Sequence, residues 1–319
     1  MDEDTRGTAP LRVRAMFPAV ATAAWEAAIA RDLKGESLEG LTWTPEPGLA
    51  IRPFYRQDHL PGLDAQLASA PGEFPFVRGG TTSWEEAQAW TPPPDAVRGD
   101  AFHDAGATAA QETGFAVAAG VDRVAGAVAK GISPAEAIGR QDFVFAAGST
   151  FFLEIAKLRA ARLLWALASA AFGVGDEHAL MRMHVRTSGA TKKADEGVTN
   201  LLRVTTESLS AVIGGCRSLT VEASGFDPRL AGNVHHIMRE ESHMDAVRDP
   251  AGGSYYIEAL TDAVAREAWA IFQDVEKEGG FDAAWQSGVI PAAIEASRAR
   301  AVAAAAFRRP ARERSGGDT

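Results

Sequence analysis

The sequence contains a single cysteine, Cys216, among 319 residues. One cysteine excludes an internal disulfide and is typical of a protein in a reducing compartment. No run of about 18 apolar residues occurs, so no membrane-spanning helix is expected. The N-terminal stretch MDEDTRGTAP is too acidic and too polar for a signal peptide. These absences predict a cytoplasmic protein without a membrane partner.

Basic residues are outnumbered, because 32 lysines and arginines stand against 42 aspartates and glutamates, for a net charge of −10. Such a balance argues against nucleic acid or an anionic membrane surface as the partner. Hydrophobic residues make up 46% of the chain. A chain of this length and composition can bury a substantial core, as one large domain or two smaller ones.

Changes in composition divide the chain into four regions. A disordered N-terminus, an N-terminal arm with its connector, a main domain and a disordered, polar tail are expected over 1–15, 16–96, 97–304 and 305–319. The arm begins with an amphipathic helix from Trp25 to Leu33, which Lys34-Gly35 ends. Extended segments with several prolines follow this helix.

The connector, residues 81–96, carries a local helix signal. The order Ser83-Trp84-Glu85-Glu86 fits a capping box at the start of a short helix. The prolines that follow Thr91 would end such a helix. We therefore expect one turn or two of helix here.

The main domain alternates short apolar runs with helical patterns. Strands are expected at Ala96–Phe102, Phe143–Ala147, Met181–Thr187 and Ser218–Glu222. Helices are expected at Thr108–Ala119, from Ser133 onward, and at Phe151–Phe172, Val198–Ile213, Pro228–Glu241 and Asp262–Lys277. Asp227 and Thr261 are the expected caps of the last two. Such alternation favours parallel strands joined by right-handed crossovers, and hence an α/β fold.

One segment is more specific than the rest. Residues 143–165, FVFAAGSTFFLEIAKLRAARLLW, read as a strand, a small-residue turn and a long helix. This string is similar to a signature of the methylmalonyl-CoA mutase family. Further resemblances are found in HDAGATAAQETGFAVAAGV, RMHVRTSGAT and NLLRVTTESLSAVIGGCRSLTV. The pairing of EESH with DPAGGSYY resembles the small, non-catalytic subunit of the heterodimeric enzymes.

The resemblance implies a fold, but only part of it. The family's barrel domain has eight βα units of the TIM type. Here PGEFPFVRGG is followed within about twenty residues by material resembling the fifth strand. We therefore expect a truncated, half-like βα barrel with an extended N-terminal arm. The cobalamin domain's Asp-x-His-x-x-Gly motif does not occur in the 319 residues.

The catalytic positions implied by the resemblance are changed. Ala101 stands where catalytic subunits carry a histidine in the substrate cavity, and the neighbouring His103 is not an aligned substitute. In the tract H-x-Q-T-S-G near corrin and substrate, Arg186 replaces the glutamine, while His184 and Ser188 are kept. The resemblance thus implies no catalytic residue. It leaves His184, Arg186 and Ser188 as candidate cofactor-binding positions.

Each candidate also has a purely structural interpretation. For His184 we favour a packed, hydrogen-bonded histidine over a cavity ligand, and for Arg186 a salt bridge over a bound carboxylate or phosphate. Lys192-Lys193 is interpreted as a solvated loop and Cys216 as a small buried side chain. Metal ligation by His236, Glu240 and His243 on one helical face is possible by spacing, but no further ligand is evident. We expect no metal site.

The leading functional hypothesis is a non-catalytic partner of a catalytic mutase chain. Adenosylcobalamin would be bound by that partner and not by this chain alone. The complex would interconvert succinyl-CoA and methylmalonyl-CoA. The family is one of isomerases, yet this chain alone is expected to be inactive. A homodimer that binds an acyl-thioester or another small molecule is the alternative.

Assembly is also suggested by the strand edges. A half barrel leaves two unpaired edges, expected here at 97–102 and 218–222. A second copy, another partner or the folded-back arm could cover them.

Overall fold

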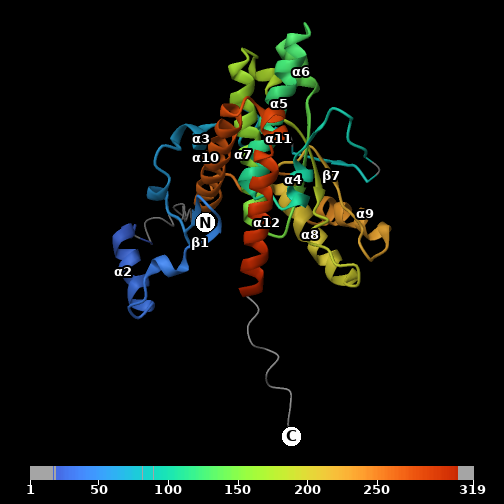
Figure 1. The fold of residues 1–319 in the computed structure, drawn as a ribbon. Helices are drawn as coiled ribbons and strands as arrows, with labels where there is room; N and C mark the ends of the chain where they lie inside the picture. The colour runs from blue at the N-terminus through green and yellow to red at the C-terminus, as the bar shows by residue number, and fades with distance from the viewer. Residues whose placement is uncertain (1–16, 18, 81, 89, 308–319) are drawn as a thin grey trace, which may run out of the picture.

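A sheet of five parallel strands forms the centre of the protein. The computed structural model describes residues 17, 19–80, 82–88 and 90–307, with side chains up to residue 304 (Figure 1). The strand order is β3-β7-β6-β5-β4, and all four neighbouring pairs are parallel. The strands are β3 (Glu85–Glu86), β4 (Val97–Arg98), β5 (Asp142–Ala147), β6 (Arg182–Thr187) and β7 (Ser218–Thr220). The expected α/β fold with a truncated parallel barrel is confirmed.

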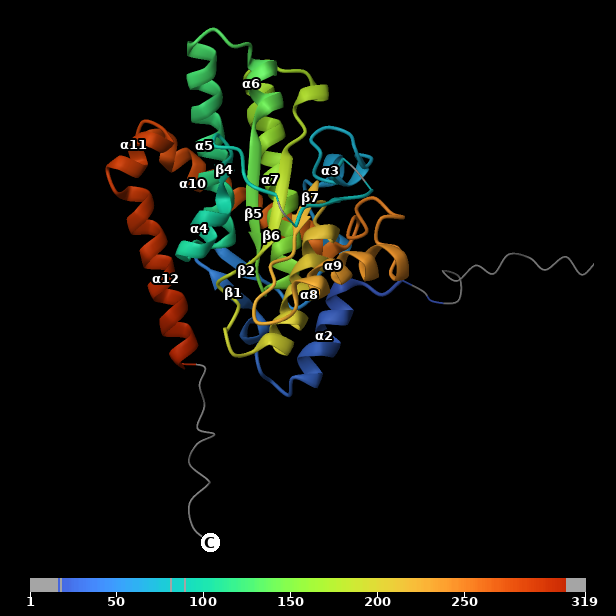
Figure 2. The same cartoon turned by 90° about the vertical axis from the view of Figure 1, so that its right-hand side faces the viewer.

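Helices cover one face of this sheet in two layers (Figure 2). The inner layer consists of α5 (Ala109–Ala129), α7 (Phe151–Ala171) and α8 (Gly197–Ile213), and α10 (Tyr255–Lys277) packs on α5 and α7. Phe143 of β5 contacts Trp165 of α7 edge-on, with ring centroids 4.6 Å apart. Both side chains are fully buried. The apolar run of β5 is thus explained by burial against a helix that follows it in sequence.

Further helices complete the main domain. They are α4 (Gly99–Ala105), α6 (Pro134–Arg140), α9 (Pro228–His236), α11 (Phe281–Gln286) and α12 (Val289–Phe307), with a π-helical turn at Ile237–Glu241 and a 3₁₀ turn at Asp176–His178. Ser133 and Asp227 cap α6 and α9 by accepting backbone N–H groups, as the sequence predicts. None of the described helices is long and apolar enough to cross a membrane.

The N-terminal arm contains α2 (Thr22–Asp32), a two-stranded antiparallel sheet of β1 (Trp43–Glu46) and β2 (Leu49–Ile51), and α3 (Asp64–Ala68). Two 3₁₀ turns at Leu38–Leu41 and Gln57–His59 join these elements. None of the α2 residues is buried, and the helix projects from the body (Figure 1). The expected arm helix is confirmed, and Lys34 and Gly35 both end it with positive φ angles.

The connector forms a strand instead of the expected helix. The N–H of Glu85 donates to the Arg217 carbonyl, and the N–H of Ala87 donates to the Leu219 carbonyl. Trp84 is buried and donates its indole N–H to His235 Nδ1 at 3.0 Å. Pairing with β7 and burial of Trp84 therefore outweigh the local capping signal. As a result β7 is not an edge, because β3 covers it.

The first strand of the main domain is shorter than expected. β4 ends at Arg98, and Gly99 to Ala105 form α4. A Cβ on Gly99 would lie 2.9 Å from the Val144 carbonyl oxygen, so glycine allows α4 to cross close over β5. Phe102 leaves the expected strand and packs edge-on with Phe115 in a separate apolar cluster. The apolar run is thus shared between strand and helix.

The helix expected behind Thr261 begins earlier, at Tyr255. Thr261 lies buried within α10, where its hydroxyl oxygen accepts from Arg159 Nε at 3.3 Å. Of the residues expected to be disordered, 1–15 and 305–319, only 305–307 are described, and there the expectation is wrong because they form the end of α12. Residues 1–15 and 308–319 lie outside the described part of the chain.

Candidate functional site

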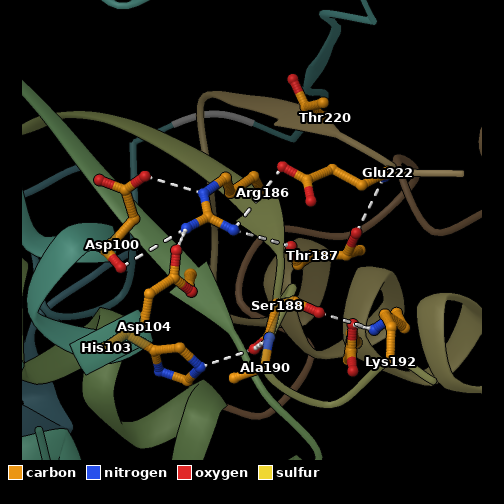
Figure 3. Close-up of polar contacts among 12 residues, drawn as sticks. Asp100, His103, Asp104, Arg186, Thr187, Ser188, Ala190, Lys192, Thr220 and Glu222 are labelled. Atoms are coloured by element: carbon orange, nitrogen blue, oxygen red, sulfur yellow. Dashed lines mark hydrogen bonds and ion pairs between the residues drawn. The ribbon is translucent and has the colours of Figure 1, made fainter. Parts of the chain in front are cut away.

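The candidate positions follow β6 toward its carboxyl end, where parallel sheets usually carry their sites. His184 and Arg186 lie on β6, and Ser188 is the first residue after this strand, which ends at Thr187. The residues after β4 and β7 reach the same end of the sheet. Figure 3 shows that side chains from these three segments meet there.

Arg186 is held by carboxylates from both sides (Figure 3). Its Nε donates to Asp100 Oδ2 at 2.8 Å, its Nη2 is paired with Asp104, and its Nη1 lies 3.6 Å from Glu222 Oε1. Arg98 binds the same Asp100 with two hydrogen bonds of 2.7 Å. Although burial opposes it, these hydrogen bonds hold the pKa of Asp100 below its ordinary value. The favoured salt-bridge interpretation of Arg186 agrees with this geometry.

His184 is packed on all sides. Its Nδ1 lies 2.8 Å from Ser218 Oγ, its Nε2 lies 3.2 Å from Thr220 Oγ1, and Trp90 stacks on its ring at 3.7 Å between centroids. Burial lowers the pKa of His184 to about 4, so the ring is neutral near pH 7. The geometry agrees with the packed, hydrogen-bonded histidine that we favoured.

Ser188 is connected to a chain of buried charges. Its Oγ lies 2.8 Å from His103 Nε2, and His103 Nδ1 lies 3.4 Å from Glu112 Oε2. The same Glu112 oxygen accepts from Lys157 at 2.7 Å, and Lys157 pairs with Glu154 at 2.5 Å. Burial opposes all three charges. Even so, Glu112 raises the pKa of His103, Lys157 lowers that of Glu112, and the two glutamates raise that of Lys157.

A serine, a histidine and a glutamate in this order resemble a nucleophilic triad. Two observations argue against that use. Ser188 has no exposed surface and its Oγ already accepts the Ala190 N–H at 3.2 Å. Glu112 is committed to Lys157 and to the N–H of Ala146. The chain of contacts therefore joins the ends of β5 and β6 to α4, α5 and α7 as a structural element.

Two further expectations are wrong. Lys192 is not solvated, because its side chain is only 5% exposed and its ammonium group pairs with Glu207 at 2.5 Å, whereas Lys193 is exposed as expected. His236, Glu240 and His243 do not share a helical face, because α9 gives way to a π-helical turn and His243 has a φ of 49°. Among the described residues no group of three potential metal ligands occurs. Cys216 is buried, and burial raises the pKa of its thiol to about 12.

Several residues of this region were not anticipated from the sequence, namely Trp90, Asp100, His103, Asp104 and Glu222. Asp100, Asp104 and Glu222 could have been found. They follow two strands that neighbour β5 and β6, and Arg186 on a buried strand needs a counter-charge. Trp90 gives no such signal, because it reaches the sheet from a connector without periodic pattern.

Comparison with known proteins agrees with the motifs. Residues 94–310, more than half of the chain, match the family model described as methylmalonyl-CoA mutase. The chain is 40% identical over 216 residues to the methylmalonyl-CoA mutase small subunit of Porphyromonas gingivalis, which is 65% of this chain and 35% of that protein. It is 40% identical over 204 residues to the small subunit from Streptomyces virginiae, covering 61% and 33%.

A third relative, the methylmalonyl-CoA mutase of Cereibacter sphaeroides, is 39% identical over 217 residues, which cover 65% of this chain and 31% of the relative. The matched part thus spans about a third of the length of these relatives. The resemblance to the small subunit is confirmed. The chain belongs to the methylmalonyl-CoA mutase family.

Proposed function

We propose that this chain is a non-catalytic, small-subunit-like protein that assembles with a catalytic mutase chain. The complex would interconvert succinyl-CoA and methylmalonyl-CoA, or a related acyl-CoA pair, in the cytoplasm. Adenosylcobalamin, bound by the partner, would supply the radical chemistry. This chain would contribute to assembly and to the rigidity of the complex.

The observation that carries this proposal is the filling of the inner sheet face. Trp90 from the connector stacks on His184, and Arg186 is bound between Asp100, Asp104 and Glu222. A substrate cavity at this face would need the space and the hydrogen bonds that these side chains use. Ala101 at the position of the catalytic histidine supports the same proposal.

The three candidate positions do not fit a cofactor in this arrangement. The ring nitrogens of His184 lie against Ser218 and Thr220, so neither is directed at a ligand. Ser188 has no exposed surface. Arg186 is bound by carboxylates, which an incoming cofactor would have to displace. A contact between cobalamin and His184 therefore requires Trp90 of the connector to move away.

Two features support assembly. Among the described strands, β3 and β4 each pair on one side only, so the sheet keeps two edges. The arm exposes several apolar side chains to solvent, including those of Phe17, Val20 and Leu41. An obligate interface usually buries more than about 2,000 Å² and is enriched in apolar area. A homodimer would cover the same features and remains the alternative, together with binding of an acyl-thioester.

The test is co-expression with a mutase chain that carries a cobalamin domain and is encoded in the same genome. We expect a stable heteromer by size-exclusion chromatography with light scattering, and isomerase activity only in the complex. The isolated chain should show neither turnover nor the absorption of bound cobalamin after incubation with adenosylcobalamin. Turnover by the isolated chain, or a monomer that captures no mutase chain at tens of micromolar, contradicts the proposal.

A further inference from the structure

One contact between the connector and the main domain depends on the protonation of a histidine. Trp84 donates its indole N–H to His235 Nδ1 at 3.0 Å, and the two residues are 4% and 0% exposed. Arg239, in the π-helical turn after α9, lies over the indole at 4.9 Å from the ring centroid and donates to the Trp84 carbonyl at 3.0 Å. Trp84 is thus held by α9 and by the turn that follows it. The contact between Trp84 and His235 is called the latch below.

The neighbouring strand β3 is attached to the sheet by a short ladder. It has two residues, and the N–H groups of Glu85 and Ala87 donate to carbonyls of the β7 segment at 2.9 and 3.0 Å. The Ala87 carbonyl accepts the Thr220 hydroxyl at 2.6 Å. Each such bond contributes little net stability, because the same groups bind water when the strand is detached. The buried latch therefore supplies a large part of the attachment of β3.

The latch fixes the protonation state of His235. An indole N–H can only donate, so Nδ1 is the unprotonated nitrogen of the ring. The proton of the neutral ring is therefore on Nε2, which is buried and has no hydrogen-bond partner among the described residues. A second proton would go to Nδ1 and would face the indole N–H, donor against donor. The hydrogen bond of the latch exists only while His235 is neutral.

The charges around His235 act in both directions. Burial is the main cause that lowers the pKa of His235, Glu86 of β3 raises it, and Arg239 and His236 lower it. Glu86 is exposed, so water and salt screen its attraction. A proton on His235 would also place a second cation beside Arg239, which holds the same indole. The docked connector therefore favours the neutral ring.

We propose that the latch is a pH-sensitive switch: when His235 takes up a proton, Trp84 separates from α9 and β3 detaches from β7. Detachment uncovers the edge of β7 and carries Trp90 away from His184. The core stays folded, because β5 and β6 pair with each other along six residues that do not involve β3. The switch belongs to this chain alone, so it does not depend on the proposed mutase partner.

The direction of the switch follows from the two pKa values of His235. In the detached connector the ring is exposed and has the ordinary value of about 6.5, whereas in the docked connector the pKa is lower. Above the ordinary value both forms are neutral, and detachment does not depend on pH. As the pH falls from there to the docked value, the detached form alone binds a proton, so detachment becomes about tenfold easier per pH unit.

Hydrogen exchange of the full chain, followed by NMR from about pH 7.5 to 5, tests the switch. The indole N–H of Trp84 and the amides of Glu85 and Ala87 report on the connector, and the amides of β5 report on the core. Because detachment also exposes His184, the effect of one histidine is measured in His184→Gln. After correction for the intrinsic pH dependence of exchange, we expect the connector signals of this variant to exchange about tenfold faster per pH unit below 6.5, with β5 unchanged.

A matched pair of variants isolates the latch. His235→Gln offers a carbonyl acceptor that does not titrate, so the double variant His184→Gln/His235→Gln should exchange its connector signals at one rate across this range. His236→Gln, at the exposed neighbour on α9, should follow the wild type. The nitrogen-15 shifts of the wild-type ring should place the proton of His235 on Nε2 at pH 7.5, a measurement that needs no variant.

Three results overturn the proposal. One is a His235 ring that carries its proton on Nδ1 at pH 7.5. Another is the same pH dependence in the double variant as in His184→Gln. The third is exchange of the β5 amides together with the connector signals, which would mean that acid unfolds the whole domain.

Discussion

Trp90 lies flat on His184, with ring centroids 3.7 Å apart and an angle of 21° between the ring planes. One residue belongs to the connector and the other to β6, 94 positions further along the chain. The contact closes the inner face of an incomplete barrel with the chain's own residues. It explains how a sheet that lacks the rest of a barrel can shield the polar residue His184 of β6 from water.

Removal of the indole should expose His184. We expect Trp90→Ala to lose about 2 kcal/mol of unfolding free energy, less than a fully buried tryptophan, because Trp90 is only half-buried. The pKa of His184 should rise from about 4 toward 6.5, since burial is the main cause of its shift. NMR titration of the histidine rings measures this. Trp285→Ala, on the surface of α11, should leave the pKa of His184 where it is.

The depressed pKa of His184 also predicts how stability depends on pH. Between about 4 and 6.5 the unfolded chain binds a proton at this ring and the folded chain does not, so unfolding becomes easier as the pH falls. At pH 5 this costs about 2 kcal/mol relative to pH 7. Urea unfolding of His184→Gln should therefore show a shallower pH dependence over this range. The same dependence in wild type and variant would contradict the assigned pKa.

Arg186 should contribute more to the free energy of unfolding than a surface arginine does. Arg186→Met leaves the buried Asp100 with Arg98 alone, and we expect a loss of about 3 kcal/mol. Arg182→Met, on the same strand, removes a more exposed pair with Asp142 and should change stability little. Urea denaturation of both variants makes the comparison. Equal effects would show that the Arg186 ion pairs are no stronger than surface pairs.

The buried Lys157 predicts a reversal of pH dependence. Lys157→Met leaves Glu112 and Glu154 buried without their cation, which should cost about 3–5 kcal/mol at pH 7. Without the cation, the burial of Glu112 is no longer offset by Lys157 and raises the pKa of its carboxyl, so the folded variant binds a proton there more readily than the unfolded one. The variant should therefore gain stability as the pH falls from 7 to 5. Lys277→Met, at an exposed pair, should show no such gain.

The strands that could be predicted from the sequence are those that a local pattern specifies. β5 and β6 combine apolar alternation with a turn and a long helix, and burial against α7 is the physical cause of both signals. The truncated parallel fold and the salt-bridge role of Arg186 were also reached from the residues and the resemblance. These features depend on neighbours in sequence or on strand ends that a parallel sheet brings together.

Long-range contacts explain what the sequence did not predict. The Ser83–Glu86 stretch fits a helix cap locally, yet its amides pair with β7, more than 130 residues away. A run of two lysines predicts that Lys192 is solvated, but its side chain is buried and forms an ion pair with Glu207 of α8. His103 was set aside because it does not align with a catalytic residue, and its contact with Ser188 depends on the early end of β4. In each case the partner comes from a distant segment without a recognisable pattern.

The pairing of β3 with β7 can be tested at one backbone amide. Glu85→Pro removes the N–H that donates to the Arg217 carbonyl, so the connector should detach from β7 at a cost of about 1–2 kcal/mol. Glu85→Ala keeps the amide, and because the Glu85 side chain is exposed, it should behave as wild type. Detachment uncovers the β7 edge and carries Trp90 away from His184. We therefore expect faster hydrogen exchange in Ser218–Thr220 and concentration-dependent self-association by light scattering, in the proline variant alone. If Glu85→Pro and Glu85→Ala exchange and associate alike, β3 does not protect this edge, and a partner chain must cover it.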